Sequence, residues 1–168
     1  MSASPKRIAI ALVVASLPAL PAQAQLRPAT ADHIGEAVGR CIAATSTAGL
    51  NLERLAEGGW QRAKTQSGEE KVDAPIPIYG KAGNRAVIIA APTEAAPACI
   101  VTARIEHFDV VSATTQGMSR ALKVSPMKSE GNETYWRYGP LIIQLAATGT
   151  REKPGIRVGV VAVAGEKK

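Results

Sequence analysis

Two histidines and two cysteines are the residues of this chain whose types could together bind a metal ion. His33 precedes Cys41 by eight residues, and His107 follows Cys99 by eight. Two imidazoles and two thiolates form a ligand set that zinc accepts. Eight residues of helix span about 12 Å and eight residues of strand about 26 Å. If the two cysteines are in contact, both histidines therefore lie too far from them to share a metal ion. We therefore expect no metal site, and no motif in the sequence points to a cofactor.

The segment from Glu106 to Asp109 is a local cluster that holds both acid and base side chains. A small hydrolase could use His107 as its general base, oriented by Glu106 or Asp109. Neighbours on a strand point to opposite faces, which separates Glu106 from His107, and we expect Asp109 to cap the following helix. His107 is thus the catalytic candidate only of an alternative function. The sequence contains no G-x-S-x-G, phosphate-binding loop, dinucleotide fingerprint or H-E-x-x-H motif.

Three of the six aromatic residues lie within Tyr135, Trp136, Arg137 and Tyr138. On a strand, Trp136 and Tyr138 share one face, and Tyr135 and Arg137 share the other. One face would fill the core, and an aromatic side chain beside a cation on the other could bind a peptide or a sugar. The alternative is that these residues form cross-strand pairs that only stabilise the sheet.

Both cysteines lie on faces that the sequence predicts to be buried. Apolar residues from Ile34 to Ile42, Cys41 among them, recur at the spacing of an amphipathic helix over residues 32–45. Residues 99–106 alternate as in a strand covered on one face, and Cys99 is on the apolar side. We expect the helix to cross this strand with a Cys41–Cys99 disulfide; two buried thiols or an intermolecular bridge are the alternatives. The closed loop of 58 residues would stabilise the fold by about 4 kcal/mol.

Residues 1–24 have the pattern of a cleaved secretory signal peptide. Lys6 and Arg7 precede an apolar run over residues 8–17, and Ala22-Gln23-Ala24 matches the A-x-A cleavage pattern. The run is shorter than the roughly 20 residues that span a bilayer. We therefore predict an exported chain, periplasmic or extracellular, whose mature part has no integral membrane segment. Export also favours the disulfide, because disulfides persist in oxidising compartments.

Composition is typical of one globular domain over residues 25–168. The whole chain is 46% hydrophobic and 20% charged, which excludes a disordered protein. Loss of Lys6 and Arg7 lowers the bases from 20 to 18 against 14 acids, so the net charge falls from +6 to +4. The bases are spread along the sequence rather than gathered in a run, and we expect no nucleic-acid partner.

Periodicity predicts the element order α-α-β-β-β-α-β-β-β. After the first helix, Asn51 caps a short helix that Gly58 and Gly59 end. Lys64 to Asp73 has no periodicity and reads as an exposed loop. A helix follows Asp109, and the predicted strands cover residues 76–79, 85–91, 99–106, 134–138, 141–147 and 156–164.

This order predicts an α+β domain with a mainly antiparallel sheet of about six strands and helices packed on one face. Pro75 and Pro77 place the first of the six strands at a sheet edge, because each proline lacks a backbone donor. The last strand is apolar on both faces, which indicates a central position or a second covered face.

The sequence alone supports two functions of different classes. The first is an exported, non-catalytic protein that binds an envelope component or another protein. The second is the small periplasmic hydrolase that uses His107. A purely structural role, or inhibition of a wall-degrading enzyme, is a third possibility that the sequence does not separate from the first. Whether a host glycosylates Asn132, in its N-x-T pattern, does not follow from the sequence.

Overall fold

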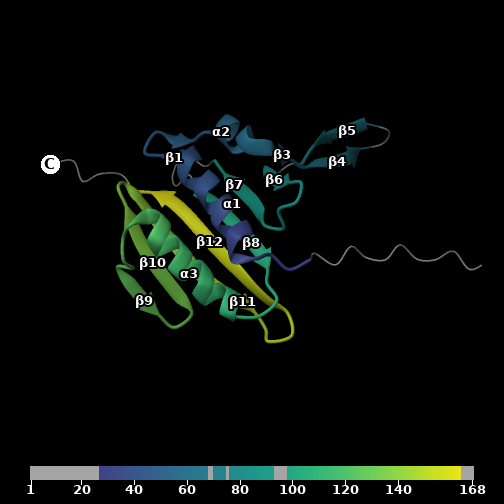
Figure 1. Cartoon of the computed structure of the whole chain (residues 1–168). Coiled ribbons are helices and arrows are strands. Elements are labelled where there is room, and N and C mark those ends of the chain that lie inside the picture. Colours follow the sequence, from purple (N-terminus) through teal and green to yellow (C-terminus); the bar gives the residue numbers. More distant parts are fainter. Residues whose placement is uncertain (1–26, 68–69, 75, 93–97, 164–168) are drawn as a thin grey trace, which may run out of the picture.

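The computed structural model describes residues 27–67, 70–74, 76–92 and 98–163. In Figure 1, helices lie in front of a large antiparallel sheet. The helical elements are α1 (Ala31–Ala44), α2 (Leu52–Ala56), the 3-10 turn η1 (Glu57–Gly59) and α3 (Asp109–Leu122). The strands are β1 (Thr45–Ser46), β2 (Gly49–Leu50), β3 (Trp60–Arg62), β4 (Lys64–Ser67), β5 (Glu70–Asp73), β6 (Ile78–Lys81), β7 (Val87–Ala91), β8 (Ala98–Arg104), β9 (Lys128–Glu130), β10 (Glu133–Tyr138), β11 (Leu141–Gly149) and β12 (Pro154–Ala162).

The main sheet contains eight strands in the order β3-β6-β7-β8-β12-β11-β10-β9, and every neighbouring pair is antiparallel. The predicted α+β class with helices on one face is confirmed. The last strand, β12, lies at the middle of the sheet, as its two apolar faces indicated. The predicted six strands were too few, because β3 and β9 extend the sheet at its two edges.

The prediction that β6 forms an edge was wrong. Pro77 precedes the strand rather than interrupting it, and its carbonyl accepts a hydrogen bond from the Ala90 amide at 2.9 Å. The outer side of β6 is therefore free to pair with β3, where Gln61 faces Gly80. Pro75 is outside the described residues.

The segment predicted to be an exposed loop, Lys64 to Asp73, forms the separate hairpin β4–β5. Backbone hydrogen bonds hold the ladder from the Lys64–Asp73 pair onward, and such bonds need no apolar alternation in the sequence. A second small hairpin, β1–β2, follows α1 directly.

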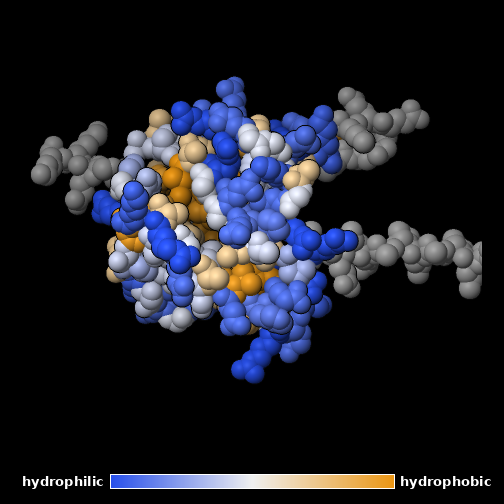
Figure 2. Space-filling model, in the orientation of Figure 1, coloured by the Kyte–Doolittle hydropathy of each residue, from blue (hydrophilic) through white to orange (hydrophobic). Residues whose placement is uncertain are grey.

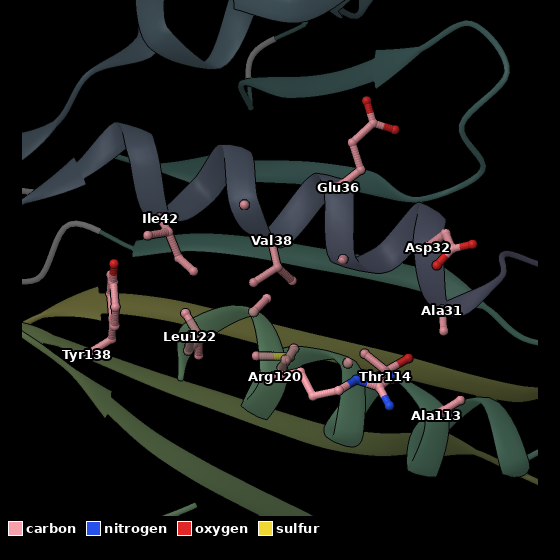
Figure 3. A pocket seen from close by; sticks show the side chains of 15 residues that line it. Ala31, Asp32, Glu36, Val38, Ile42, Ala113, Thr114, Arg120, Leu122 and Tyr138 are labelled. Atoms are coloured by element: carbon pink, nitrogen blue, oxygen red, sulfur yellow. The ribbon is translucent and has the colours of Figure 1, made fainter. Parts of the chain in front are cut away.

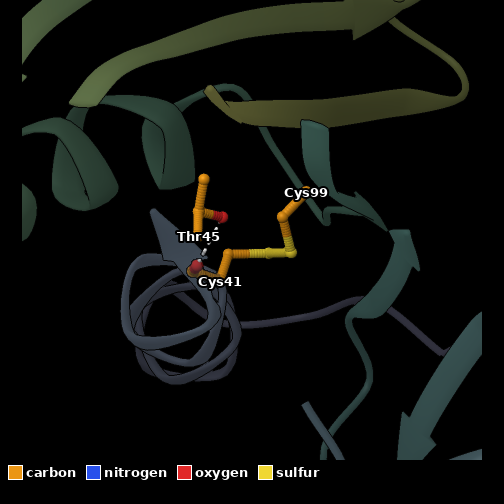
Figure 4. The surroundings of a disulfide bond; sticks show 3 residues. All are labelled: Cys41, Thr45 and Cys99. Carbon is orange, nitrogen blue, oxygen red and sulfur yellow. Dashed lines mark hydrogen bonds between the residues drawn. A yellow bond between two sulfur atoms is a disulfide. The ribbon is translucent and has the colours of Figure 1, made fainter. Parts of the chain in front are cut away.

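Helix α1 begins and packs as its sequence dictates. The Thr30 side chain accepts a hydrogen bond from the His33 amide, and His33 Nδ1 accepts one from the Thr30 amide, which completes a capping box. The face that packs on the sheet is fully buried. Cys41 on this face is bonded to Cys99 of β8, with 5.5 Å between the two Cα atoms, and the predicted disulfide is thus present (Figure 4).

Helix α3 differs in detail from its prediction. It begins at Asp109, so the residue at its N-cap position is Phe108, which makes no side-chain cap. Asp109 is instead an acid of the first turn, where the helix dipole favours negative charge. The preceding strand ends at Arg104, two residues earlier than predicted.

The core lies between the sheet and the helices. Most strand residues that point toward the helices are buried, whereas most of their neighbours on the opposite face are half-buried or exposed; Ala146, 3% exposed, is an exception on that face. Trp60 packs into this core, with 2% of its surface exposed. Other large, fully buried side chains come from both layers: Trp136, Ile34, Leu55, Ile88, Ile105, Ile143, Leu145, Ile156, Val101, Val158 and Val160.

No helix in the described part of the chain is long and apolar enough to cross a membrane.

Candidate functional site: a groove between two helices

A groove runs between α1 and α3 on the outer surface of the helical layer. Its volume is about 650 Å³, within the range of pockets that hold small ligands. Figure 2 shows hydrophobic side chains gathered in a hollow between these helices, with hydrophilic residues around it. In Figure 3, Ala31 and Ala113 lie at one end and Ile42 and Leu122 at the other, so the two helices run parallel.

Small residues line both walls of the groove. They recur every four residues, which places them on one line along each helix. The line on α1 is Ala31, Gly35 and Gly39, and the line on α3 is Ala113, Gly117 and Ala121. The walls therefore consist largely of helix backbone.

Larger apolar side chains close the bottom and one end of the groove. Val38 and Met118 are buried, with 2% and 5% of their surfaces exposed, and Val38 points down between the helices (Figure 3). Ile42 and Leu122 are half-buried at the C-terminal ends of the two helices. Tyr138 of β10 stands beside them, with 43% of its surface exposed.

The three helix glycines in the walls are not required by packing. A Cβ atom added at Gly35, Gly39 or Gly117 would meet no atom within 4 Å. Glycine inside a helix costs about 1 kcal/mol relative to alanine. Glycine at these positions therefore lowers helix stability without avoiding any clash inside the fold. The space that a side chain would occupy stays open as part of the groove.

Charged groups are few and stand at the rim. Asp32 lies near the N-terminal end of α1, and Arg120 extends along the α3 wall (Figure 3). Among the described residues, Arg120 has no salt bridge and its side chain has no hydrogen bond. An apolar groove with one unpaired cation can hold a chain with an anionic end.

Glu36 borders the groove but points away from it (Figure 3). Its carboxylate accepts hydrogen bonds from Lys81 Nζ at 2.5 Å and from Asn84 Nδ2 at 2.8 Å. The hydrogen bond from Lys81, followed by that from Asn84, holds the pKa of Glu36 below its usual value. Glu36 thus fastens α1 to the turn between β6 and β7.

His107 does not line the groove. It lies exposed between β8 and α3, and its carbonyl accepts a hydrogen bond from the Val110 amide at 3.2 Å. Within the described ranges, its side chain has no hydrogen-bond partner, and neither Glu106 nor Asp109 is bonded to it. The constellation that a hydrolase would need is therefore not assembled around this residue.

The four residues from Tyr135 to Tyr138 lie on β10 and divide between its faces as the alternation predicted. Trp136 is fully buried toward the helices, and its Nε1 donates to Ser119 Oγ of α3 at 3.0 Å. Tyr138, on the same face, reaches the groove. Tyr135 and Arg137 point to the opposite face of the sheet, so the four residues do not form one binding site.

Tyr135 belongs to a small polar network on that opposite face. Its hydroxyl donates to the Glu133 carboxylate and accepts from Gln144 Nε2 at 3.1 Å. The hydrogen bond between Tyr135 and Glu133 raises the pKa of Tyr135 and lowers the pKa of Glu133. A phenol with a raised pKa stays protonated at neutral pH, so it is a hydrogen-bond donor here rather than a base.

The part of the chain that the structure describes contains no group of three or more His, Cys, Asp or Glu residues able to hold a metal ion. Cys41 and Cys99 are both in the disulfide, and His33 takes part in the capping box of α1.

The groove itself was not predicted from the sequence. Its signal is the four-residue spacing of small residues in two helical segments that are otherwise amphipathic. That signal means little until the two helices are known to lie side by side. No protein-family model, curated protein or solved structure matches the chain.

Proposed function

We propose that the protein is an exported, non-catalytic binding protein that takes the hydrocarbon chain of a single-chain anionic amphiphile, an envelope lipid component, into the α1–α3 groove. The observation that carries this proposal is the set of helix glycines whose missing side chains keep an apolar groove open.

The dimensions of the groove favour a single chain. From Ala31 to Ile42, α1 rises by about 17 Å at about 1.5 Å per residue. A volume of about 650 Å³ over that length gives a cross-section on the order of 40 Å², or about 7 Å across. An α-helix with its side chains is about 10–12 Å wide. The groove is therefore too narrow to enclose a whole helix and wide enough for a hydrocarbon chain.

The chemistry of the walls disfavours an extended peptide in the same space. A bound peptide backbone would need hydrogen-bond partners along its whole length. The walls offer Gly, Ala and aliphatic groups, and the buried Thr114 hydroxyl already donates to the Val110 carbonyl at 2.7 Å. A hydrocarbon chain needs no such partners, so its transfer from water is favourable.

Arg120 determines the charge of the head group that we propose. It lines the groove without a salt bridge among the described residues. A carboxylate or phosphate that pairs with a guanidinium gains a charge-assisted hydrogen bond. Export of the chain, predicted from residues 1–24, would bring it to envelope lipids.

Titration calorimetry of the mature protein with dodecanoate, below its micelle concentration, tests the proposal. Gly39→Leu places an aliphatic side chain in the groove where a Cβ meets no atom within 4 Å, so we expect binding to be lost while the fold is retained. Ala43→Leu is the matched control, since Ala43 is exposed on α1 outside the groove. Equal binding by both variants, or no binding by the unmodified protein, would overturn the proposal.

The head group is tested separately. Arg120→Met should weaken dodecanoate binding by roughly tenfold through loss of a charge-assisted hydrogen bond, and should leave the binding of dodecanol nearly unchanged. An equal loss for both probes would mean that Arg120 contributes packing rather than charge recognition.

No observation favours the alternative hydrolase. His107 lies outside the groove, and within the described residues it lacks an orienting partner. Its use as a general base stays a sequence-based hypothesis, and the proposed binding role does not involve it.

A further inference from the structure

The face of the sheet opposite the helices is a second surface that the proposed function does not use. All the described helices lie on one side: α1 through Cys41–Cys99, α3 through Ser119 and Trp136, and α2 against α1. None of them covers the opposite face. We call this opposite surface the open face.

The centre of the open face is apolar. The strand register aligns Ile78, Ile89 and Ile100 in one row across β6, β7 and β8. The row continues through Gly159, Gln144 and Tyr135 of the next strands. A solvated face of an antiparallel sheet normally carries polar residues at such positions. Apolar side chains that remain accessible together on one face mark an interaction surface.

Two further rows flank this central row. One contains Val87, Thr102, Arg157, Ala146 and Glu133, and the other contains Ala91, Ala98, Val161, Ile142 and Arg137. We propose that a second copy of the chain packs on the open face, about a two-fold axis that runs along the row of Ile78, Ile89 and Ile100.

This axis makes the surface complementary to itself. A rotation of 180° about the central row keeps that row opposite its own copy and exchanges the two flanking rows. Val87 then faces Ala91 of the second copy, and Ala146 faces Ile142, so these large side chains meet small ones. On β12 the exposed Arg157 faces Val161. On β10, next to the edge strand β9, Glu133 of each copy faces Arg137 of the other, which gives two identical pairs of opposite charge.

The surroundings of Arg137 and Glu133 on β10 bear on this pairing. Within the described residues, Arg137 is exposed and has no salt bridge or side-chain hydrogen bond. Glu133 is already engaged: it accepts a hydrogen bond from the Tyr135 hydroxyl, and Gln144 and Arg157 also lower its pKa. Arg137 is thus available to a partner at the point where the two-fold axis would bring it opposite Glu133.

The size of the open face is sufficient for a stable dimer. Eight strands spaced about 4.8 Å apart, with residues rising about 3.3 Å along each, give a projected area on the order of 700 Å². A standard protein interface buries about 600–1,000 Å² on each partner, so the open face reaches this range when nearly all of it is covered.

Sedimentation velocity of the mature, oxidised chain over a wide concentration range tests the inference. We expect a monomer–dimer equilibrium, and a monomer at every concentration would overturn the proposal and point to a different occupant of this face. Ile100→Lys should weaken the dimer by at least about a hundredfold, because it buries a charge at the axis. Gln116→Lys on the exposed side of α3 is the matched control and should change nothing.

Charge reversal tests the orientation of the two copies. Arg137→Glu should weaken the dimer roughly tenfold by placing two carboxylates opposite each other. Addition of Glu133→Arg to the same chain should restore most of the affinity. The proposed axis would be excluded if Ile100→Lys left the dimer affinity unchanged. It would also be excluded if the Arg137→Glu, Glu133→Arg double variant bound more weakly than Arg137→Glu alone. Each variant is checked by circular dichroism, and dodecanoate binding by the monomeric variants separates this inference from the proposed function.

Discussion

The two faces of the eight-stranded sheet are made by the same strands and differ in what covers them. On the covered face, α1 and α3 bury almost every strand side chain, and the disulfide fixes α1 to β8. On the open face, β6, β7 and β8 carry a row of isoleucines and β10 carries charged residues. Burial alone therefore does not explain the sequence of the open face, because a solvated sheet face requires no row of isoleucines.

The helical layer shows the same contrast on a smaller scale. The faces of α1 and α3 toward the sheet are closely packed, whereas their facing sides leave a groove lined by glycine and alanine. Both unfilled surfaces lie where the sequence departs from what stability alone would favour: glycine inside helices, and aliphatic residues on an uncovered sheet. Such departures are where interaction sites are expected.

The largest expected effect concerns the disulfide that attaches α1 to the covered face of the sheet. Replacement of both Cys41 and Cys99 by alanine removes a link across 58 residues, and the chain-entropy model predicts a loss of about 4 kcal/mol in the free energy of unfolding. Urea denaturation of the oxidised protein and the double variant measures the loss. The unmodified protein in reductant is the control, since it lacks the bond but keeps the sulfur atoms. A loss below about 1 kcal/mol would mean that packing alone secures α1.

Substitution of two adjacent isoleucines of β7 compares how much each face contributes to the free energy of unfolding. Ile88 is fully buried on the covered face, and Ile89 is half-buried on the open face. Ile88→Ala should lower the free energy of unfolding by about 3 kcal/mol through lost burial and a residual cavity, and Ile89→Ala by less than about 1 kcal/mol in the monomer.

Denaturation of both variants at low and high protein concentration sharpens this comparison. The loss from Ile89→Ala should grow with concentration if a second copy covers the open face, because the dimer stabilises only the folded chain. The loss from Ile88→Ala should not grow in the same way. Equal losses at both positions would show that the open face is buried within the monomer.

Much of the fold could be predicted from the sequence because its strongest signals are local. The stripe from Ile34 to Ile42 and the alternation after Cys99 each fix a buried face, and together they predicted both the helix on the sheet and the disulfide. Pairing of β3 with β6 could not be predicted, because it depends on where Pro77 falls relative to the strand. The β4–β5 hairpin was missed because polar backbone pairing leaves no hydropathy pattern.

The candidate site could not be predicted for a different reason. Gly35, Gly39 and Gly117 read separately as weak points of two helices, and only the side-by-side placement of α1 and α3 turns them into one groove. The aromatic cluster at β10 shows the opposite error. Tyr135 and Tyr138 are near in sequence but lie on opposite faces, so one predicted binding segment contributes to two separate surfaces.

The smallest expected effect concerns the second attachment of α1, the clamp of Glu36 to Lys81 and Asn84. Because these hydrogen bonds lower the pKa of Glu36 in the folded state, the stability that they contribute is fully present above the unfolded-state pKa, about 4.3. It is lost as the pH falls through the lower folded-state value. Glu36 is largely exposed, so the contribution should be below about 1 kcal/mol.

Glu36→Gln should therefore lower the melting temperature slightly at pH 6, and the difference from the unmodified protein should shrink as the pH is taken below about 4. Glu53→Gln is the matched control, since Glu53 is exposed on α2 and its side chain has no hydrogen bond to the described residues. A difference for Glu36→Gln that persists unchanged at pH 3 would show that the ionised carboxylate does not hold this end of α1 on the sheet, which would leave the disulfide and the apolar stripe to secure the whole helix.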